Sequence, residues 1–378
     1  MHNYQSWPWL EEMSPSTYSG DINWPKLSIV MPTLNQGEYI EEAIRSVICQ
    51  NYPNLQFVII DGGSTDATVE VIKKYESDIY YWISEPDLGQ SDAINKGFAK
   101  CDGEVFNWIN SDDFYEKESF LKLATHFLDD DVDIICGLEY GFRDYNARTI
   151  SKGSTIHHDL ENTILSGHID QPATFWRRSV FESLGAISID LHYAMDSEMW
   201  LRYLLKYGQS RIKKVPDVLV NFRYHLFSKT VSGKDRMNQE YFSLMHSIFY
   251  FINRTDEILA VVKELYDRPR IREWSICDGL DIAKMRYAAV NLLLNHLIIV
   301  SDFRPFTEQQ IFDAITESNN AFDSSEICRK LSIYEATLYN WRRKFAGLSA
   351  QEILAIKQRE TEDPSVSILR SELRRMQN

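Results

Sequence analysis

The fold is decided by one stretch, Val105-Phe106-Asn107-Trp108-Ile109-Asn110-Ser111-Asp112-Asp113. Its apolar part is short and rich in β-branched and aromatic residues, which favours a buried strand over a helix. Asp112 and Asp113 then follow the carboxyl end of that strand, the edge where open α/β sheets bind ligands. Adjacent carboxylates repel each other, so a divalent cation that also holds phosphate oxygens is expected there. The alternative is a solvated turn in which Ser-Asp-Asp starts a helix at Phe114.

Composition limits the classes of protein to which this 378-residue chain can belong. Its net charge of −15 disfavours a dedicated nucleic-acid-binding protein, which would present a basic surface. The five cysteines are scattered and lack CxxC spacing, so the sequence indicates reduced thiols rather than disulfides or a zinc site. No signal peptide is evident, and the longest apolar stretch, Tyr287 to Val300, is too short to span a bilayer. We therefore expect a cytoplasmic protein without a transmembrane segment; a peripheral position at the inner face of the membrane stays open.

Strands and helices alternate along the first half of the chain. Strands are predicted at Leu27–Met31, Leu55–Ile60, Ile79–Ile83, from Val105, and at Val132–Gly137; helices are predicted at Glu38–Gln50, Ala67–Tyr75 with Thr65 as its N-cap, and Ala93–Ala99. This alternation predicts a parallel doubly wound sheet. The segment before Pro25 is aromatic and aperiodic, and its tryptophans Trp7, Trp9 and Trp24 either pack on the body or belong to a mobile arm.

Polar loops follow the strands at one edge of the predicted sheet. They place Asp61, the Asp112/Asp113 pair and the loops at Thr33 and Gln90 together, which is the expected form of a nucleotide site. The glycines after Asp61 let the backbone approach a ligand closely, with helix N–H groups behind them. The sequence lacks a GxGxxG fingerprint and a GxxxxGK P-loop, which disfavours a dehydrogenase or an NTPase.

Three motifs of this half resemble those of the GT-A-fold family 2 glycosyltransferases, many of which build bacterial surface polysaccharides. They are Val30–Asn35 (VMPTLN), Ile60–Asp66 (IDGGSTD) and Asn110–Asp113 (NSDD). The similarity covers about residues 26–230. It implies an α/β chain with a GT-A (Rossmann-like) doubly wound mixed sheet, followed by an all-α C-terminal region.

The resemblance also implies roles for individual residues. Asp61 matches the position that holds the nucleotide base, Asp112 the position at the ribose or metal, and Asp113 the preferred metal ligand. Mn²⁺ or Mg²⁺ would neutralise charge on the departing nucleoside diphosphate. The remaining nucleotide-contacting candidates are Pro32, Thr33, Asn35, Gly63, Gln90, Asp92 and Lys96. For Lys96, pairing with a surface acid is the alternative to a phosphate contact.

A helix predicted from Met195 to Tyr207 carries the candidate catalytic base. Asp196 lies at its start, where the helix dipole stabilises a carboxylate. The stretch is similar to the family's acidic motif, whose base deprotonates the acceptor hydroxyl as it attacks the sugar. Asp196 matches the base position, and Glu198 ranks second because it points away from Asp196 on a helix. The alternative is that Asp196 is an ordinary acid at a helix N-terminus.

A predicted strand and loop from Asn221 to Thr230 look like a segment that many relatives carry after the base. His225 is a candidate for the metal or the diphosphate, and Lys229 for the diphosphate. A structural histidine is the alternative for His225.

The C-terminal part of the chain is predicted to be helical, at Tyr241–Ile252, Asp256–Tyr266, Ile282–Val300 and Ser365–Met376. Between the last two, short helices around a tight turn lead into the basic stretch Leu338–Phe345 (LYNWRRKF), a helix-turn-helix pattern. It resembles the DNA-binding module of insertion-sequence transposases. In that module the residues facing the groove or phosphates would be Thr337, Tyr339, Asn340, Arg342 and Arg343.

Charge argues against strong DNA binding by this module. Residues 301–378 contain eleven Lys and Arg against twelve Asp and Glu, a net charge of −1, whereas DNA affinity comes mainly from phosphate neutralisation. We therefore favour a protein-contact module or a homo-oligomer formed through the C-terminal helices; DNA is the less favoured partner.

Together these patterns predict five segments and one principal function. The segments are an N-terminal extension (1–25), a GT-A glycosyltransferase domain (26–232), a helical region (233–300), a helix-turn-helix-like module (301–350) and a helical tail (351–378). The expected activity is metal-dependent, inverting transfer from a nucleotide-sugar, a UDP-sugar by family habit, to an acceptor hydroxyl in surface polysaccharide or lipid-linked glycan synthesis. Two alternatives stay open: a DNA-associated glycosyltransferase acting on a hydroxylated base, and a non-catalytic binding or regulatory protein.

Overall fold

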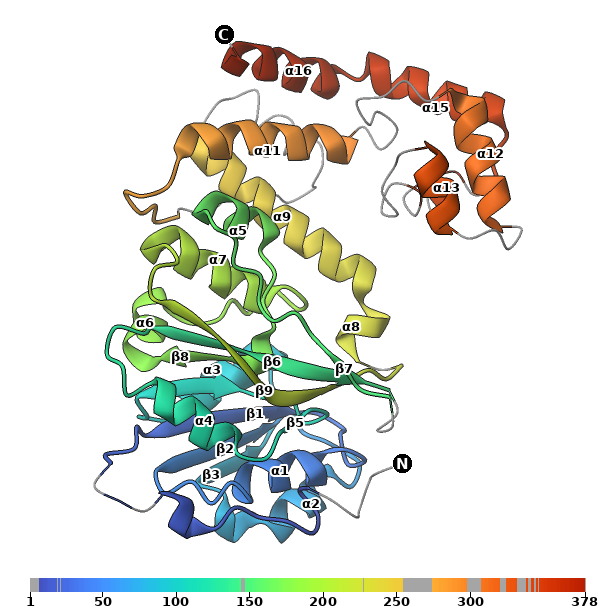
Figure 1. Ribbon diagram of the computed structural model, residues 1–378. Helices are drawn as coiled ribbons and strands as arrows, with labels where there is room; N and C mark the ends of the chain where they lie inside the picture. Colours follow the sequence, from blue (N-terminus) through green and yellow to red (C-terminus); the bar gives the residue numbers. More distant parts are fainter. Residues whose placement is uncertain are drawn as a thin grey trace. The chain divides into compact units, whose positions relative to one another are not determined.

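The computed structural model describes residues 7–18, 20, 22–143, 147–226, 228–253, 274–297, 307–319, 324–331, 338, 341–342, 345 and 347–377. The chain forms two compact units, coloured along the sequence in Figure 1. The first comprises Met1–Leu244 and Trp274–Leu280, and the second comprises Met245–Glu273 and Asp281–Asn378. All three glycosyltransferase-like motifs lie in the first unit.

A mixed sheet of nine strands, counted over the described residues, runs through the first unit. The strands are β1 (Leu27–Thr33), β2 (Leu55–Asp61), β3 (Tyr81–Ser84), β4 (Val105–Trp108), β5 (Phe114–Tyr115), β6 (Ile134–Phe142), β7 (Thr149–Ile150), β8 (Thr174–Arg177) and β9 (Ile212–Arg223). Their order is β3-β2-β1-β4-β8-β6-β9-β5, with β7 on β6. The first four strands are parallel, as predicted. The later part of the sheet contains antiparallel pairs, so a wholly parallel sheet was wrong and the mixed sheet is confirmed.

Helices of the first unit connect and cover these strands. They are η1 (Pro15–Tyr18), α1 (Ile40–Ile48), α2 (Thr68–Lys74), η2 (Glu76–Asp78), α3 (Gln90–Phe98), α4 (Ser119–His126), α5 (Leu160–Ser166), η3 (Gln171–Ala173), α6 (Arg178–Leu184), α7 (Met195–Tyr207), α8 (Lys229–Ser232) and the first part of α9 (Lys234–Asn253).

One alternative and two local predictions need correction. No helix starts at Phe114, because Phe114 pairs with Asn221 in an antiparallel ladder. Thr65 does not cap α2; instead Asp66 Oδ1 accepts the Thr68 N–H at 3.0 Å, one residue closer to the helix. Helix α3 begins at Gln90, three residues before the predicted start.

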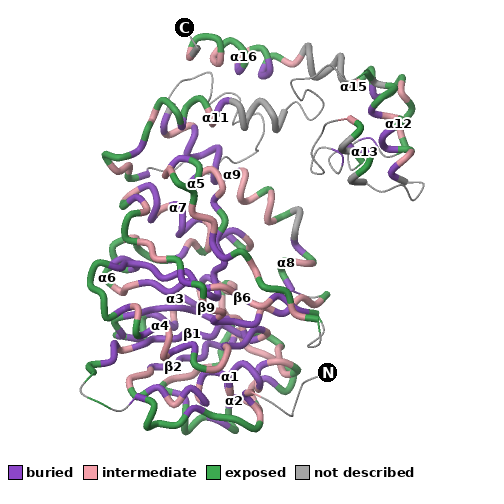
Figure 2. Tube along the Cα trace, in the orientation of Figure 1, coloured by how far each residue is buried: buried purple, intermediate pink, exposed green. Residues whose placement is uncertain are grey.

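Side chains of the parallel strands alternate between two layers of helices. Ile29 and Met31 of β1 belong to a core shared with α1, α2 and α4. Val30 points the opposite way, toward α3, where a Cβ atom on Gly97 would collide with its side chain. The glycine therefore permits the close approach of α3 to the sheet. Figure 2 shows β1 and β2 as largely buried.

Aromatic packing fixes helix α7 against the sheet. The Trp176 ring of β8 lies edge-on to the rings of Trp200 and Tyr203, at centroid distances of 6.0 and 5.9 Å. All three side chains are buried. Since α7 carries Asp196, this cluster sets the position of the candidate base relative to the sheet.

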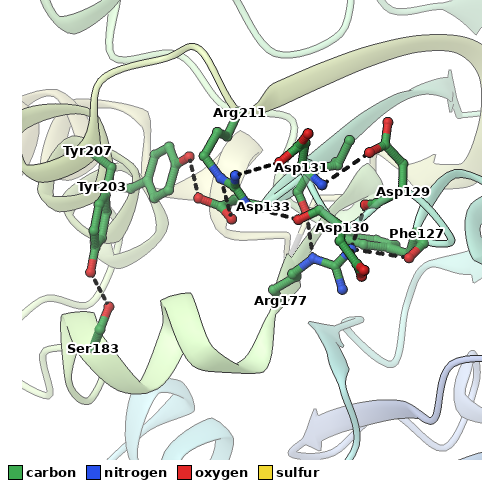
Figure 3. A network of polar contacts seen from close by, with 11 residues as sticks. Phe127, Asp129, Asp130, Asp131, Asp133, Arg177, Ser183, Tyr203, Tyr207 and Arg211 are labelled. Atoms are coloured by element: carbon green, nitrogen blue, oxygen red, sulfur yellow. Dashed lines mark hydrogen bonds and ion pairs between the residues drawn. The ribbon is translucent and has the colours of Figure 1, made fainter.

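Two arginines hold the acidic turn that precedes β6 (Figure 3). Arg177 donates to the backbone oxygens of Phe127, Asp129 and Val132. Arg211 Nε lies 2.9 Å from Asp133 Oδ1, and the Tyr203 hydroxyl donates to Asp133 Oδ2 at 3.2 Å. The same network thus connects the start of β6 to β8, β9 and α7.

The N-terminal segment packs on the body of the first unit. Trp7 Nε1 donates to the backbone oxygen of Tyr115 at 2.8 Å, and the Arg45 guanidinium lies 5.4 Å from the centre of the Trp9 ring. Trp24 is buried, with its Nε1 donating to Tyr18 O. Packing is therefore confirmed for the described part of the segment, and the mobile-arm alternative is wrong there.

The described part of the second unit is all helical, as predicted. Besides the end of α9, its helices are α11 (Ile282–Leu297), α12 (Glu308–Asn319), α13 (Ser324–Leu331), α15 (Ala350–Glu362) and α16 (Pro364–Gln377). Ile311, Ile327, Trp341 and Ile353 share one apolar core, so α12, α13 and α15 pack together. The helix predicted at Asp256–Tyr266 lies outside the described residues. In the part of the chain that is described, no helix is long and apolar enough to cross a membrane.

Candidate functional site

The first site element is a carboxylate fixed at the end of β2. Asp61 pairs in register with Thr33 of β1 and Ser84 of β3, so the three residues lie side by side at the carboxyl edge. Asp61 Oδ2 accepts the N–H groups of Gly63 and Ser64 at 3.2 and 2.9 Å and the Ser84 hydroxyl at 2.6 Å. These donors hold the buried Asp61 side chain in one orientation.

Hydrogen bonds join the three motifs to one another. The Asn35 N–H donates to Ser64 Oγ at 2.7 Å, and Asn35 Oδ1 accepts the Thr65 N–H at 2.9 Å. Asn35 has a φ of +52°, a conformation that Asn tolerates better than most residues. The Ser111 hydroxyl donates to Thr33 Oγ1 at 2.8 Å. The loops after β1, β2 and β4 therefore form one connected edge, with Pro32 inside β1 and Gly63 in the β2 loop.

The two aspartates of the third motif point into different surroundings. The Asp112 side chain is 15% exposed, and its Oδ2 lies 2.8 Å from Nε2 of His225. Asp113 is only 1% exposed, and its Oδ1 accepts the Arg223 N–H at 2.8 Å. Burial, followed by the negative charge of Asp112, holds the pKa of Asp113 well above its usual range. Asp112 is thus the more accessible metal-ligand candidate.

Gln90 and Lys229 connect this edge to the candidate base. Gln90 Nε2 donates to Asn110 Oδ1 at 2.6 Å, and Lys229 Nζ donates to Gln90 Oε1 at 2.7 Å and to His192 O at 2.8 Å. Burial lowers the pKa of Lys229, although nearby carboxylates oppose that shift. The segment around His225 and Lys229 therefore reaches both the acidic motif and the start of α7.

Asp92 and Lys96 make a separate surface cluster. Lys96 Nζ lies 3.2 Å from both Glu85 Oε1 and Asp92 Oδ2, and Asp92 also accepts the Leu88 N–H. Pairing with surface acids was the alternative interpretation of Lys96. Among the described contacts of Asp92 and Lys96, none reaches Asp61 or Asp112.

The two acids of α7 differ in surroundings. Asp196 is partly buried and accepts the Ser197 N–H at 2.7 Å, and burial raises its pKa. A carboxylate whose pKa is raised is a stronger base and is better suited to accept a proton. Glu198 is fully buried, and its Oε2 lies 2.9 Å from Nη2 of Arg202. Glu198 therefore takes part in an ion pair along the helix.

Three polar residues of the site have no role in the sequence interpretation. Asp87 lies against Gly62, where an added Cβ would be 2.7 Å from Asp87 Oδ2. Arg223 donates to Asp112 O at 2.9 Å and to Glu42 Oε2 at 2.7 Å. Glu240 of α9 accepts three successive N–H groups, from His192, Tyr193 and Ala194. Asp87 could have been found from the sequence, because it begins the loop Asp87-Leu88-Gly89 that follows β3. Arg223 and Glu240 could not, because their hydrogen-bond partners are distant in sequence.

Comparison with known proteins gives this arrangement its family. Residues 28–185 match the sequence model of glycosyl transferase family 2, a range that contains all three motifs. The chain contains a family 2 glycosyltransferase domain. It is an enzyme of the glycosyltransferase class, and the non-catalytic alternative is set aside. Residues 303–376 match a helix-turn-helix model described as a transposase.

Similar proteins agree with this assignment. The glycosyltransferase is 26% identical over 257 residues to an uncharacterized glycosyltransferase of Rickettsia typhi, covering 65% of this chain and 77% of the relative. It is 34% identical over 62 residues to the poly(ribitol-phosphate) beta-N-acetylglucosaminyltransferase TarS of Staphylococcus aureus, covering 16% of this chain and 11% of TarS.

Solved structures of TarS share the fold. The crystal structure of TarS residues 1–349 in complex with UDP matches with a TM-score of 0.51 at 17% identity, covering 92% of this chain and 91% of that one. Against a longer TarS structure the match covers 88% of this chain and 55% of TarS, also with a TM-score of 0.51.

The predicted DNA-facing residues are mostly not described. Thr337, Tyr339, Asn340 and Arg343 lie outside the described residues, and Arg342 is exposed. What the structure does describe there is a set of helices with an apolar core of their own, around Ile311, Trp341 and Ile353.

We predict that Glu240 sets the position of the base helix. Replacing Glu240 by Gln removes the charge from three backbone hydrogen bonds, and hydrogen bonds to charged groups contribute about 1.5–3 kcal/mol. We expect Glu240→Gln to lower the free energy of unfolding by about 1–3 kcal/mol and to lower kcat more than the affinity for the nucleotide. Urea unfolding and steady-state kinetics measure these effects. Gln239→Ala, an exposed change on the same helix, is the control; an equal loss there would refute the assignment.

Proposed function

We propose that the glycosyltransferase moves a sugar from a UDP-sugar to an acceptor hydroxyl, with inversion and with the help of a divalent cation. The observation that carries this proposal is the hydrogen-bonded path from Asn110 through Gln90 and Lys229 to the backbone of His192, three residues before α7. This path supports our proposal that the candidate diphosphate edge and the candidate base belong to one site.

The metal would be held by Asp112 and His225. Among the described residues no three His, Cys, Asp or Glu side chains form a metal-binding group. Two donors still fit, because Mg²⁺-type ions in nucleotide sites use one or two protein ligands together with substrate phosphates. We assign Asp112 rather than Asp113, since the Asp113 carboxyl is buried and engaged with the Arg223 N–H. When bound, the ion would neutralise charge on the leaving diphosphate.

The chain's own residues supply the remaining steps. Asp61, held by its loop, is the proposed ligand of the base of the nucleotide. Lys229 carries a positive charge beside the proposed diphosphate position and orients Gln90. Asp196 removes the proton of the acceptor hydroxyl as that oxygen attacks the anomeric carbon. A base that activates the attacking oxygen directly, without a covalent sugar intermediate, leads to inversion.

Metal-dependent nucleotide binding tests the first part of this proposal. In calorimetric titrations of UDP, with GDP and dTDP as controls, we expect binding that requires Mn²⁺. Asp112→Asn and His225→Ala should each weaken it at least about tenfold, while Asp113→Asn, which keeps an acceptor oxygen for the Arg223 N–H, should bind nearly as the wild type. Loss of binding in Asp113→Asn alone would make Asp113 the metal ligand, as the sequence predicts.

The pH dependence of transfer tests the base. Asp196 acts when ionised, and its pKa is raised, so kcat/KM should fall as the pH is lowered, with an apparent pKa above the ordinary Asp value of about 4. Asp196→Asn should keep UDP binding and lose transfer by about 10²-fold or more. The adjacent change Ser197→Ala should leave the profile unchanged. Transfer that survives Asp196→Asn but not Glu198→Gln would move the role to Glu198.

The acceptor is proposed to be a surface polysaccharide or a lipid-linked glycan intermediate. The named relative TarS acts on poly(ribitol-phosphate), a polymer of this general kind. A cytoplasmic enzyme that works at the inner face of the membrane would meet such an acceptor. We propose that the C-terminal helices contact a protein partner or a second copy.

A second candidate function is supported by the transposase-type match at residues 303–376. In it, the helix-turn-helix targets the enzyme to DNA, where it glycosylates a hydroxylated base. The net charge of −1 over residues 301–378 disfavours this. We expect the full chain not to retard a random-sequence duplex at about 50 mM salt. Retardation that is lost in the Arg342→Ala, Arg343→Ala double variant would establish the DNA-associated function instead.

A further inference from the structure

Between helices α6 and α7 the chain forms a loop, residues 185–194, that contains neither helix nor strand. We call it the pre-α7 loop, because it leads directly to the helix that carries Asp196. Without a ladder or helix of its own, its backbone groups need side chains as partners. At its start, Arg202 of α7 donates to three successive backbone oxygens, and at its end Glu240 of α9 accepts three successive N–H groups.

Helix α3 holds the middle of the pre-α7 loop. Asn95 Nδ2 donates to Ile187 O at 2.8 Å, and Asn95 Oδ1 accepts the Ile187 N–H at 3.0 Å. Ser91 lies one turn earlier on the same face of the helix, with its Oγ 3.3 Å from Leu191 O and 3.1 Å from Met195 Sδ. Ser91, Ile187 and Leu191 are buried. Two points of the loop are thus fixed to α3, and Met195 is the residue just before Asp196.

The same helix reaches the acidic motif at its other end. Gln90, the first residue of α3, donates to Asn110 Oδ1 at 2.6 Å, two residues before Asp112. Gln90 and Asn95 are five residues apart, which in an α-helix is a fixed separation of about 7.5 Å along the axis. One rigid helix therefore connects the loop that leads to the candidate base with the motif that carries the proposed metal ligand.

We propose that Asn95, assisted by Ser91, is a positioning residue of the transfer reaction, which fixes the pre-α7 loop, and with it Asp196, relative to the acidic motif. The proposal rests on the proposed function, in which Asp196 is the base and Asp112 holds the metal. An amide suits this role because it donates and accepts a hydrogen bond at the same time. Without it, both backbone groups of the buried Ile187 lose their partner.

The rate of transfer should be sensitive to this contact, while nucleotide binding should not. A displacement of about 1 Å caused by a change far from the reacting atoms can lower a rate about a hundredfold. Both described hydrogen bonds of the Asn95 side chain go to Ile187 and none to the motifs that form the candidate nucleotide edge. Loss of the amide should therefore move the base and leave the donor site intact.

Three measurements on the full chain test the role of Asn95. In calorimetric titrations with Mn²⁺, the UDP affinity of Asn95→Ala should stay within about twofold of the wild type. Hydrogen exchange in residues 185–194 should become at least about tenfold faster, with unchanged exchange in the three motifs. UDP release from the fastest donor in a screen of UDP-sugars, with water as the acceptor, should fall about tenfold to a hundredfold in kcat with little change in KM. Ser91→Ala should lower kcat in the same direction by a smaller factor, and it carries the test if Asn95→Ala fails to fold.

The matched control is Lys100→Ala, an exposed change two residues after the end of α3, which should behave as the wild type in all three measurements. The role of Asn95 is overturned if kcat is unchanged in both variants, if exchange in residues 185–194 is unchanged, or if kcat falls only together with UDP affinity. Wild-type protein that binds no UDP, or releases none from any donor, would refute the proposed function and this role with it. Normal wild-type behaviour without an effect of either substitution would refute the role alone.

Discussion

Arg223 connects parts of the first unit that are far apart in the sequence. Its guanidinium forms an ion pair with Glu42 of α1 at 2.7 Å and donates to the backbone of Asp112, while its own N–H donates to Asp113. Both members of the ion pair are nearly buried. Losing one partner of such a pair leaves an uncompensated charge and costs about 3–5 kcal/mol. The position of β9, and with it that of His225 next to Asp112, depends on this residue.

Negative charge is the second constraint on the molecule. Asp112, Asp113 and Asp196 belong to the proposed site, and Glu139 and Asp170 are further buried carboxyls of the same unit, in a chain whose net charge is already −15. Burial raises the pKa values of Asp113, Glu139 and Asp196. Strongly perturbed carboxyls that cluster beside a polar edge are typical of functional sites rather than of stabilising cores. The apolar layers on both sides of the sheet and the aromatic cluster under α7 stabilise the fold that carries them.

The two units of the chain differ in the residues that they carry. The first holds every residue of the proposed transfer reaction, from Asp61 to Lys229. The second has its own apolar core around Trp341 and matches a transposase-type helix-turn-helix. A nearly neutral module of this kind is better suited to protein contact than to phosphate contact. This separation is the basis of our proposal that the C-terminal helices contact a protein partner or a second copy.

The local sequence determined the parallel half of the fold and the three motifs. Each of these strands is a short apolar run followed directly by polar loop residues, and both features can be read within a few neighbouring positions. It also determined the helix that carries Asp196, whose bounds were predicted correctly. Tertiary structure alone decided which aspartate of the NSDD motif is accessible, since Asp112 and Asp113 differ only in the segments that pack around them. The strand pairings of the antiparallel half, the β5 strand in place of the alternative helix, and the contacts of Arg223 and Glu240 were likewise beyond the local sequence. Each depends on contacts between residues tens of positions apart, and no local pattern records such contacts.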